Sequence, residues 1–507
     1  MSLTGTPVDA VIAEAGLSQS LDDIGAYIVR QRWSGGQGRR VRDVNIVDSA
    51  VLGEGDATLL FTVTRVAYAD GTVREYALPL GLRRIGDPLA ERAPDFMIAP
   101  GLTDDSRFLY DALGDPEYVQ WLWTAVRGRR TLQTARSTLR FECPDPDALE
   151  PDPEPPMRIL GVEQSNTSLI LGDSTFVKHV RRVEPGPSHE LEMLSALTAA
   201  GFRNLAPVQA TAMYDAAGAA GAPIVLVQPY LHNGTEGWSL ALTSLRDLYA
   251  DAEEAADAGA VERISTVDEH GGAFTGESGR LGAVSAAMHL ALTQPGLGAD
   301  VEPVPLTGRH LHAWADSMTR ELDQLLTHPE SALDPLRDAR DAVIAHFEAL
   351  RSVDPAGLCT RIHGDLHLGQ TLRTDSGWII LDFEGEPDRT PAERRERSSP
   401  LRDVAGMLRS LDYAAAVALA ERVLPESADW NGMLAYGDAW AQANRDSFWS
   451  GYLSAVGDRA LLPSPGATTV VRRAFEVQKA VYEVGYELTH RPSWIDIPMR
   501  FLLRGAA

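Results

Sequence analysis

The pattern of hydrophobic positions divides the chain into regions of different secondary structure. Residues 8–32 have the apolar spacing of a helix and end in a glycine-rich turn. From 44 to 82, short apolar and β-branched runs lie on either side of Ala69-Asp-Gly71, which predicts a β-hairpin. A helical stretch rich in aromatic residues follows, near 108–123. The first part of the chain is therefore predicted to be a small α+β unit.

A segment rich in proline and acid, 143–156, follows this unit and has few residues that could pack in a core. Such a composition predicts a linker. Beyond it the pattern returns to short apolar runs, and then becomes helical to the end of the chain. The predicted domains are a cap at 1–143, a linker at 144–157, a β-rich lobe with a hinge at 158–232 and a helical lobe at 233–507.

Composition restricts the classes of partner and of location. The chain has 507 residues and a net charge of −25, which argues against a nucleic acid or an anionic membrane as partner. The two cysteines, Cys143 and Cys359, are far apart and argue against a disulfide scaffold or a structural zinc site. Neither a signal peptide nor a membrane-spanning run is visible, so a cytoplasmic location is expected.

Two polar motifs in the helical region carry the clearest chemistry. Arg361-Ile-His-Gly-Asp-Leu-His-Leu-Gly-Gln370 places Asp365 on a loop, with Gln370 five positions later. A short apolar run then delivers Asp382. An acid, an amide and a second acid in this order are typical of kinase-like phosphotransferases, in which the first acid faces the attacking hydroxyl and the other two hold Mg²⁺. We expect Asp365 to be catalytic and Gln370 and Asp382 to be metal ligands.

The upstream lobe has the parts that would bind ATP in such an enzyme. Lys178 lies in a predicted strand, where a lysine can reach the α- and β-phosphates. A helix at 188–200 follows, and Glu192 is favoured over Glu190 as the partner of the lysine. The phosphate cover is predicted at Ser165, Asn166 and Thr167, and the hinge contacts at Gln228 and Tyr230.

The sugar or other acceptor is harder to predict from spacing. On the last long helix, Lys479, Glu483 and Glu487 share one stripe, with Tyr482 and Tyr486 on a neighbouring one. This arrangement fits a carbohydrate-binding wall and fits equally a surface ion pair beside core tyrosines. The candidate acceptor contacts are His363, Arg402, Lys479, Glu483, Tyr486 and Glu487.

These motifs resemble those of bacterial, in particular actinobacterial, maltokinases, within the aminoglycoside-phosphotransferase-like kinase superfamily. The similarity covers most of 158–500 and rests on the segments 162–168, 236–238, 272–278, 363–370, 382–387, 399–406, 481–487 and 490–494. It implies an α+β, bilobal protein-kinase-like (aminoglycoside-phosphotransferase-like) fold with an N-terminal α+β cap subdomain. It also implies transfer of phosphate from ATP, with Mg²⁺, to the anomeric hydroxyl of maltose, giving maltose 1-phosphate.

Other functions remain open at this point. Arg32-Trp-Ser-Gly-Gly-Gln-Gly38 matches the cap pattern of maltokinases only loosely, and 252–270 is longer than is typical. Glucosamine or another aminosugar, giving glucosamine 6-phosphate, is therefore the close alternative acceptor. An aminoglycoside phosphotransferase and a catalytically silent scaffold are further alternatives. An association with a trehalose-metabolising enzyme is also predicted.

Overall fold

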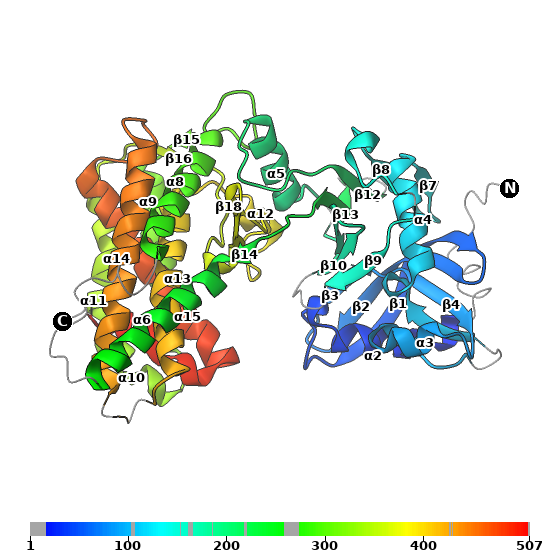
Figure 1. Ribbon diagram of the computed structural model, residues 1–507, viewed down its shortest axis with the longest axis horizontal. Helices are drawn as coiled ribbons and strands as arrows, with labels where there is room; N and C mark the ends of the chain where they lie inside the picture. Colours follow the sequence, from blue (N-terminus) through cyan, green and yellow to red (C-terminus); the bar gives the residue numbers. More distant parts are fainter. Residues whose placement is uncertain are drawn as a thin grey trace. The chain divides into compact units, whose positions relative to one another are not determined.

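The computed structural model describes residues 17–504 apart from 103–106, 153, 161–165, 185, 217–220, 258–272, 425–426 and 428. The chain divides into two compact units (Figure 1). The first comprises Met1–Leu191 and Ala206–Leu231, and the second comprises Glu192–Leu205 and His232–Ala507. Most of the described strands lie in the first unit and most of the long helices in the second.

The first unit begins with a six-stranded antiparallel sheet in the order β1-β2-β4-β6-β5, with β3 paired to β2. Helix α2 buries Ile24, Tyr27 and Ile28 in a core that includes Trp33. The hairpin predicted at residues 69–71 is present, and Gly71 has the positive φ that its turn requires (86°). The elements are α2 (Leu21–Arg30), β1 (Val41–Glu54), β2 (Thr58–Tyr68), β3 (Val73–Ala77), β4 (Leu80–Arg84), β5 (Met97–Ala99), β6 (Arg107–Asp111) and α4 (Pro116–Arg127).

A second sheet of seven antiparallel strands completes the first unit. It includes strands from before and after the predicted linker, because β8 pairs with β12. Helix α5 (His189–Ala199) follows β11, the strand that carries Lys178. The strand order is β7 (Thr131–Gln133), β8 (Ser137–Glu142), β12 (Ala210–Ala216), β13 (Ala222–Pro229), β11 (Thr175–Val180), β10 (Asn166–Leu171) and β9 (Met157–Leu160).

The expectation that the predicted linker has little to pack was wrong. Cys143 and Leu149 are buried in the core of the first unit. The indole N–H of Trp123 donates to the carbonyl of Asp152 (3.1 Å), and Gln209 Nε2 donates to the carbonyl of Ala148 (3.1 Å). Two apolar side chains and these hydrogen bonds hold the proline-rich segment against the first unit. The predicted domain boundaries themselves stay a prediction.

The second unit is built on long helices that pack side by side (Figure 1). Helices α8 and α14 approach closely, since a Cβ on Gly451 would collide with the carbonyl of Gly279. A small sheet, β14-β17-β18, contains the two strands that lie between Gln370 and Asp382 in the sequence. The main elements are β14 (Thr235–Glu236), α6 (Gly237–Asp257), α8 (Phe274–Ala291), β15 (Val304–Pro305), α9 (Gly308–Leu326), α11 (Arg340–Glu348), β16 (Leu358–Cys359), β17 (Thr371–Thr374), β18 (Gly377–Ile380), α13 (Leu401–Ala420), α14 (Trp430–Val456), α15 (Pro465–His490) and α16 (Asp496–Arg504).

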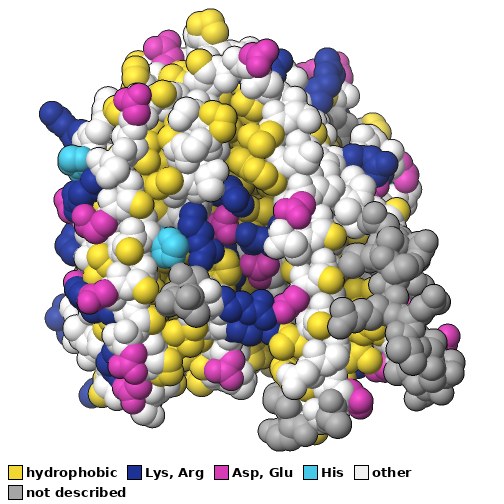
Figure 2. All heavy atoms as spheres, turned by 90° about the vertical axis from the view of Figure 1, so that its left-hand side faces the viewer, with side chains coloured by type: hydrophobic (Ala, Val, Ile, Leu, Met, Phe, Trp, Pro, Cys, Tyr) yellow, Lys and Arg dark blue, Asp and Glu magenta, His cyan; other side chains and the backbone are white. Residues whose placement is uncertain are grey.

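Across the described part of the chain, helices that combine enough length with enough apolar character to cross a membrane are not found. Figure 2 shows basic and acidic side chains interspersed on the side of the helical unit.

Candidate active site

The loop between β16 and β17 carries Asp365 and is held from behind by a buried carboxylate. Asp403, in the first turn of α13, accepts the backbone N–H of His363 and of Gly364, each over 2.8 Å. Gly364 has a φ of 87°, a conformation that side chains with a Cβ rarely adopt. These contacts fix the backbone on both sides of the bend that presents Asp365.

The side chain of His363 is buried and does not line the cavity described below, so its prediction as a substrate contact is corrected. Its side chain is fully buried and its Nε2 hydrogen-bonds the carbonyl of Leu381 (2.8 Å), next to Asp382. Its Nδ1 accepts the backbone N–H of Asp365 (3.3 Å), and its ring lies against Phe383. The histidine therefore connects the two acidic motifs.

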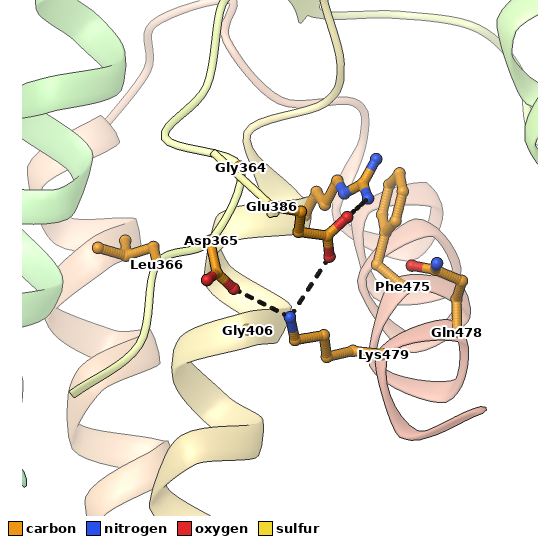
Figure 3. A pocket seen from close by; sticks show the side chains of 9 residues that line it. Gly364, Asp365, Leu366, Glu386, Gly406, Phe475, Gln478 and Lys479 are labelled. Atoms are coloured by element: carbon orange, nitrogen blue, oxygen red, sulfur yellow. Dashed lines mark hydrogen bonds and ion pairs between the residues drawn. The ribbon is translucent and has the colours of Figure 1, made fainter. Parts of the chain in front are cut away.

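Asp365 forms an ion pair with a lysine from the last long helix (Figure 3). Lys479 Nζ lies 3.1 Å from Oδ1 of Asp365 and 3.4 Å from Oε1 of Glu386. Glu386 is 6% exposed, and its other oxygen accepts from Arg402 (2.8 Å) and Arg389 (2.5 Å). Two carboxylates and three cations thus form one connected cluster.

The cluster keeps its carboxylates ionised. Burial would raise the pKa of Asp365, but the charge of Lys479 lowers it below its usual value. Burial also opposes ionisation of Glu386, but Lys479, Arg402 and Arg389 lower its pKa to about 2. Burial would lower the pKa of Lys479, and its two carboxylate partners raise it well above the usual range. Both acids carry a negative charge and the lysine a positive one at neutral pH.

A small cavity opens beside this cluster. Phe475 and Gln478, from α15, form one side and the loop forms another (Figure 3). Gly406 of α13 forms the floor, where a Cβ would lie only 2.7 Å from the carbonyl of Leu366. The charged side chains in its wall are Asp365, Glu386, Arg402 and Lys479.

The predicted metal ligands lie next to each other. Gln370 Nε2 donates to Oδ2 of Asp382 over 2.9 Å, which leaves the amide carbonyl of Gln370 available as a ligand. Asp382 is exposed and has a φ of 56°, a strained conformation for a residue other than glycine. Strain at a carboxylate that ends a strand is typical of functional positions, and both side chains offer the hard oxygen ligands that Mg²⁺ prefers.

The partner of Lys178 is Glu190, so the prediction of Glu192 was wrong. Lys178 Nζ lies 2.7 Å from Oε1 of Glu190, and both side chains are buried. Residues two positions apart on a helix point about 200° apart, so only one of the two glutamates can face the strand. Glu190 is in the first turn of α5, where a negative charge also suits the helix dipole.

Glu192 instead binds two arginines of the second unit. Arg395 donates to both of its carboxylate oxygens (2.8 and 2.9 Å), and Arg361 donates to one (3.1 Å). Burial opposes ionisation of Glu192, and the hydrogen bond from Arg395 together with the charge of Arg361 lowers its pKa. The side chain of Arg361, the first residue of the motif that carries Asp365, is thereby held by Glu192.

The other predicted nucleotide contacts lie in the second sheet. Asn166 begins β10 and is buried, and Thr167 Oγ1 accepts from Arg181 Nε (2.9 Å). Gln228 Nε2 donates to the carbonyl of Ala206 (2.6 Å), and the backbone N–H of Tyr230 donates to Ser174 (2.7 Å). Ser165 lies outside the described residues. The nucleotide roles of these residues stay predictions.

Two of the predicted acceptor contacts are not among the residues that line the cavity. Glu483 accepts from Arg409 of α13 (2.7 and 3.1 Å). Glu487, 1% exposed, accepts from Tyr413 (3.2 Å) and from Arg491 (2.8 Å). Both residues were predicted to contact substrate. Their carboxylates instead join α15 to α13, through Arg409 and Tyr413.

Tyr486 is half-buried on a different stripe of α15. It lies between Tyr482 and His490, at ring distances of 6.4 and 4.3 Å. Tyr482 in turn lies beneath Lys479 Nζ, which is 4.8 Å from the centre of its ring. An aromatic strip therefore leads along α15 away from the catalytic cluster.

Sequence reasoning missed the roles of Glu386 and Asp403. Glu386 is in the quoted motif that begins at Asp382, four residues after it, and an acid so close to a metal ligand was a usable signal. Asp403 lies in the first turn of α13, but its targets lie about 40 positions earlier and no local pattern points to them.

Comparisons with known proteins show what this chain is similar to. Residues 27–115 match the maltokinase N-terminal cap domain. The chain is 28% identical to the glucosamine kinase of Mycolicibacterium smegmatis over 67% of its length and 77% of that protein. It is also 28% identical to the glucosamine kinase of Streptacidiphilus jiangxiensis, over 66% of its length and 70% of that protein. The chain is a sugar phosphotransferase, and its N-terminal part matches the maltokinase cap domain.

The fold of this kinase agrees with that assignment. A solved glucosamine kinase in complex with glucosamine, ADP and inorganic phosphate superimposes with a TM-score of 0.61 and 22% identity, covering 93% of this chain and 94% of that one. Another solved glucosamine kinase structure, crystal form B, gives a TM-score of 0.60 over 90% of this chain and 92% of that one, also at 22% identity. The predicted α+β kinase-like fold with an N-terminal cap is confirmed.

Proposed function

We propose that this kinase transfers the γ-phosphoryl group of ATP, with Mg²⁺, to a neutral sugar, and that maltose is its acceptor. The observation that carries the proposal is the charge balance beside Asp365. Among the described residues that line the cavity, each carboxylate is already paired with a cation: Asp365 with Lys479, and Glu386 with Arg402 and Lys479.

The charge balance distinguishes between maltose and glucosamine as the acceptor. The protonated amine of glucosamine needs a carboxylate whose charge is not already compensated. Here Lys479 and Arg402 are in the cavity wall, and Arg389 adds a third cation behind Glu386. A further cation would meet repulsion at this point, whereas the hydroxyls of a neutral sugar can donate to the carboxylates and accept from the cations.

The aromatic strip on α15 supports an acceptor larger than one hexose. Tyr482, Tyr486 and His490 are four residues apart, so the strip extends over about 12 Å of helix. Flat aromatic faces cover the C–H surface of sugar rings. A disaccharide whose reducing end reaches Asp365 could place its second ring along this strip.

Asp365 prepares the acceptor hydroxyl. Its ionised carboxylate accepts the hydrogen of that hydroxyl, whose oxygen then faces the γ-phosphorus. The bond between the γ-phosphorus and the leaving oxygen of ADP breaks as the new bond to the sugar oxygen forms, and the hydroxyl proton passes to Asp365. The lowered pKa of Asp365 makes it a weak base, which suits a loose transition state in which the proton leaves late. The product from maltose is maltose 1-phosphate.

Gln370 and Asp382 are the residues that would hold Mg²⁺. Their adjacent oxygen ligands fit this ion, and the strained backbone of Asp382 presents its carboxylate at the surface of the unit. The ion, when bound, neutralises charge on the phosphates.

ATP would meet Lys178, whose ammonium Glu190 orients from α5. Asn166 and Thr167 begin the strand that pairs with β11 and would cover the phosphates. The hinge contacts proposed at Gln228 and Tyr230 follow on β13 and just after it.

Glucosamine remains the second candidate, because the relatives quoted above are glucosamine kinases. The predicted association with a trehalose-metabolising enzyme and the predicted cytoplasmic location stay predictions.

A coupled assay of ADP release tests the proposal with maltose, glucose, glucosamine and kanamycin as acceptors. We expect the highest kcat/KM with maltose, and loss of that activity by about 10²–10⁴-fold in Asp365→Asn. Turnover of glucosamine without turnover of maltose would contradict the assignment of the acceptor. Full activity in Asp365→Asn would contradict the mechanism.

A further inference from the structure

A buried arginine on α13 holds the glutamate that lies one helical turn from Lys479. Arg409 Nε and Nη2 donate to Oε2 of Glu483 (3.1 and 2.7 Å), and Nη1 donates to Asp412 (3.0 Å). Arg409 is 1% exposed, and its guanidinium carbon lies 4.2 Å from the ring centre of Phe501 on α16. Two carboxylates and an aromatic face therefore fix this arginine, and the mechanism described above does not use it.

Lys479 has carboxylates on two sides. Its Nζ lies 3.1 Å from Oδ1 of Asp365 (Figure 3), while Glu483 follows four residues later on α15. Side chains four residues apart on a helix are neighbours, so an ammonium and a carboxylate at this spacing attract each other. Burial would lower the pKa of Lys479; Asp365 contributes most to raising it, and Glu483 contributes as well. Glu483 is therefore a second carboxylate to which the lysine could turn.

Arg409 compensates the charge of Glu483. Among the described residues, it is the cation that hydrogen-bonds this glutamate. Burial raises the pKa of Glu483, the charge of Arg409 opposes that rise most strongly, and Lys479 is the next cation to oppose it. A buried carboxylate that loses its partner is strongly unfavourable and attracts another cation. Without Arg409, that cation would be Lys479.

We propose that Arg409 is a positioning residue for phosphoryl transfer: by compensating Glu483, it leaves the ammonium of Lys479 to Asp365. Arg409 acts through the lysine and is not among the residues that line the cavity. The inference rests on the catalytic role proposed for Asp365, and it does not depend on which sugar is the acceptor. A role in packing alone would join α13 to α15 without deciding which carboxylate holds Lys479.

The test compares variants of the full chain. Arg409→Gln removes the cation, and Arg409→Gln with Glu483→Gln removes both members of the pair. Arg409→Gln is also made in the Lys479→Gln chain, which lacks the group through which Arg409 would act. The readouts are kcat/KM for the sugar, the KM for ATP, thermal stability, and a crystal structure of Arg409→Gln.

Arg445→Gln is the matched control. Arg445, on α14, also donates to Asp412 (3.0 Å) and to a glutamate of α15, Glu476 (2.6 Å). Arg472 lies 2.9 Å from the other carboxylate oxygen of Glu476, so that glutamate keeps a cation when Arg445 is removed. This variant should lower thermal stability and leave kcat/KM for the sugar within about threefold of the wild-type value.

We expect kcat/KM for the sugar to fall about 10–100-fold in Arg409→Gln, the scale of one charge-assisted hydrogen bond, while the KM for ATP stays within about threefold. Adding Glu483→Gln should restore kcat/KM to within about threefold of the wild type, because the competing carboxylate is gone. In the Lys479→Gln chain, Arg409→Gln should cause no further loss, since two changes that act through one group do not add. The crystal structure should place Lys479 Nζ closer to Glu483 than to Asp365.

A wild-type kcat/KM in Arg409→Gln, or a structure of it in which Lys479 stays on Asp365, would overturn the proposal. So would a failure of Glu483→Gln to restore activity, a further loss in the Lys479→Gln chain, or an equal loss in Arg445→Gln, since each indicates packing alone. If Arg409→Gln does not fold, the double variant with Glu483→Gln decides, and a loss of about tenfold or more in it overturns the proposal. If the wild-type chain phosphorylated none of the sugars tested, the proposed function would fail, while the crystal structure would still show which carboxylate holds Lys479.

Discussion

The ammonium of Lys479, on the last long helix, lies 3.1 Å from the carboxylate of Asp365 on the catalytic loop. This pair joins the proposed catalytic residue to an element more than 100 positions later in the chain. The charge of Lys479 lowers the pKa of Asp365 against the effect of burial. We therefore propose that Lys479 affects both catalysis and the choice of sugar.

Replacing Lys479 should change the preference among acceptors. In Lys479→Gln the pKa of Asp365 should rise and one positive charge leaves the cavity. We expect kcat/KM for maltose to fall about 10–100-fold, with a smaller fall or a gain for glucosamine. Steady-state kinetics with both sugars give the ratio, and Lys479→Arg, which keeps the charge, is the control. An equal loss for both sugars would show that the lysine does not select the acceptor.

Changes at the proposed metal ligands should act through Mg²⁺. Asp382→Asn replaces a charged ligand with a neutral one, so the Mg²⁺ concentration for half-maximal activity should rise about tenfold or more. Gln370→Asn keeps the ligand type but shortens the side chain, and a smaller rise is expected. Titration of activity against Mg²⁺ at saturating ATP and sugar measures both. A Mg²⁺ dependence identical to that of the wild type in Asp382→Asn would contradict the assignment.

Two neighbouring glutamates of α5 should have separate effects. Glu190→Gln removes the buried partner of Lys178, so the KM for ATP should rise about tenfold. Glu192→Gln removes the shared partner of Arg361 and Arg395, so it should lower thermal stability and leave the KM for ATP within about threefold. Kinetics at varied ATP and thermal unfolding of both variants make the comparison. The reverse pattern would restore Glu192 as the partner of the lysine.

Glu386 should stabilise the fold in a pH-dependent way. Its pKa is lowered from 4.5 to about 2 by Lys479, Arg402 and Arg389. A carboxyl group with a lowered pKa stabilises the folded state fully above its unfolded pKa, and this contribution is lost as the pH falls toward the folded value. The stability difference between wild type and Glu386→Gln, of the order of 3 kcal/mol from this shift, should stay constant above pH 4.5 and shrink below it. Urea unfolding across this range measures it; a difference that does not depend on pH would argue against the ion cluster.

The parts of the site that are local in the chain could be predicted from the sequence. Asp365, Gln370 and Asp382 lie within 18 residues, and their order predicts a phosphotransfer unit. The strand that carries Lys178 and the helix after it were also predicted. The choice between Glu190 and Glu192 depends on which face of that helix is turned toward the strand, and two acids within one turn do not reveal this.

The contacts that could not be predicted connect distant segments. Glu483 and Glu487 share a stripe with Lys479, and only the packing of α15 against α13 shows that they accept from Arg409 and Tyr413. Leu149 is one apolar residue in a proline-rich segment, and its burial depends on a core formed by other parts of the chain. Residue type and spacing describe one face of an element, and tertiary packing decides what that face meets.

One measurement tests the central claim most directly. The wild-type kinase is given Mg-ATP with equal concentrations of maltose and glucosamine in a single reaction, and the phosphorylated products are identified by ³¹P NMR. The charge balance around Asp365 and Lys479 predicts that the signal of maltose 1-phosphate dominates. Accumulation of glucosamine 6-phosphate with no maltose 1-phosphate would contradict the account.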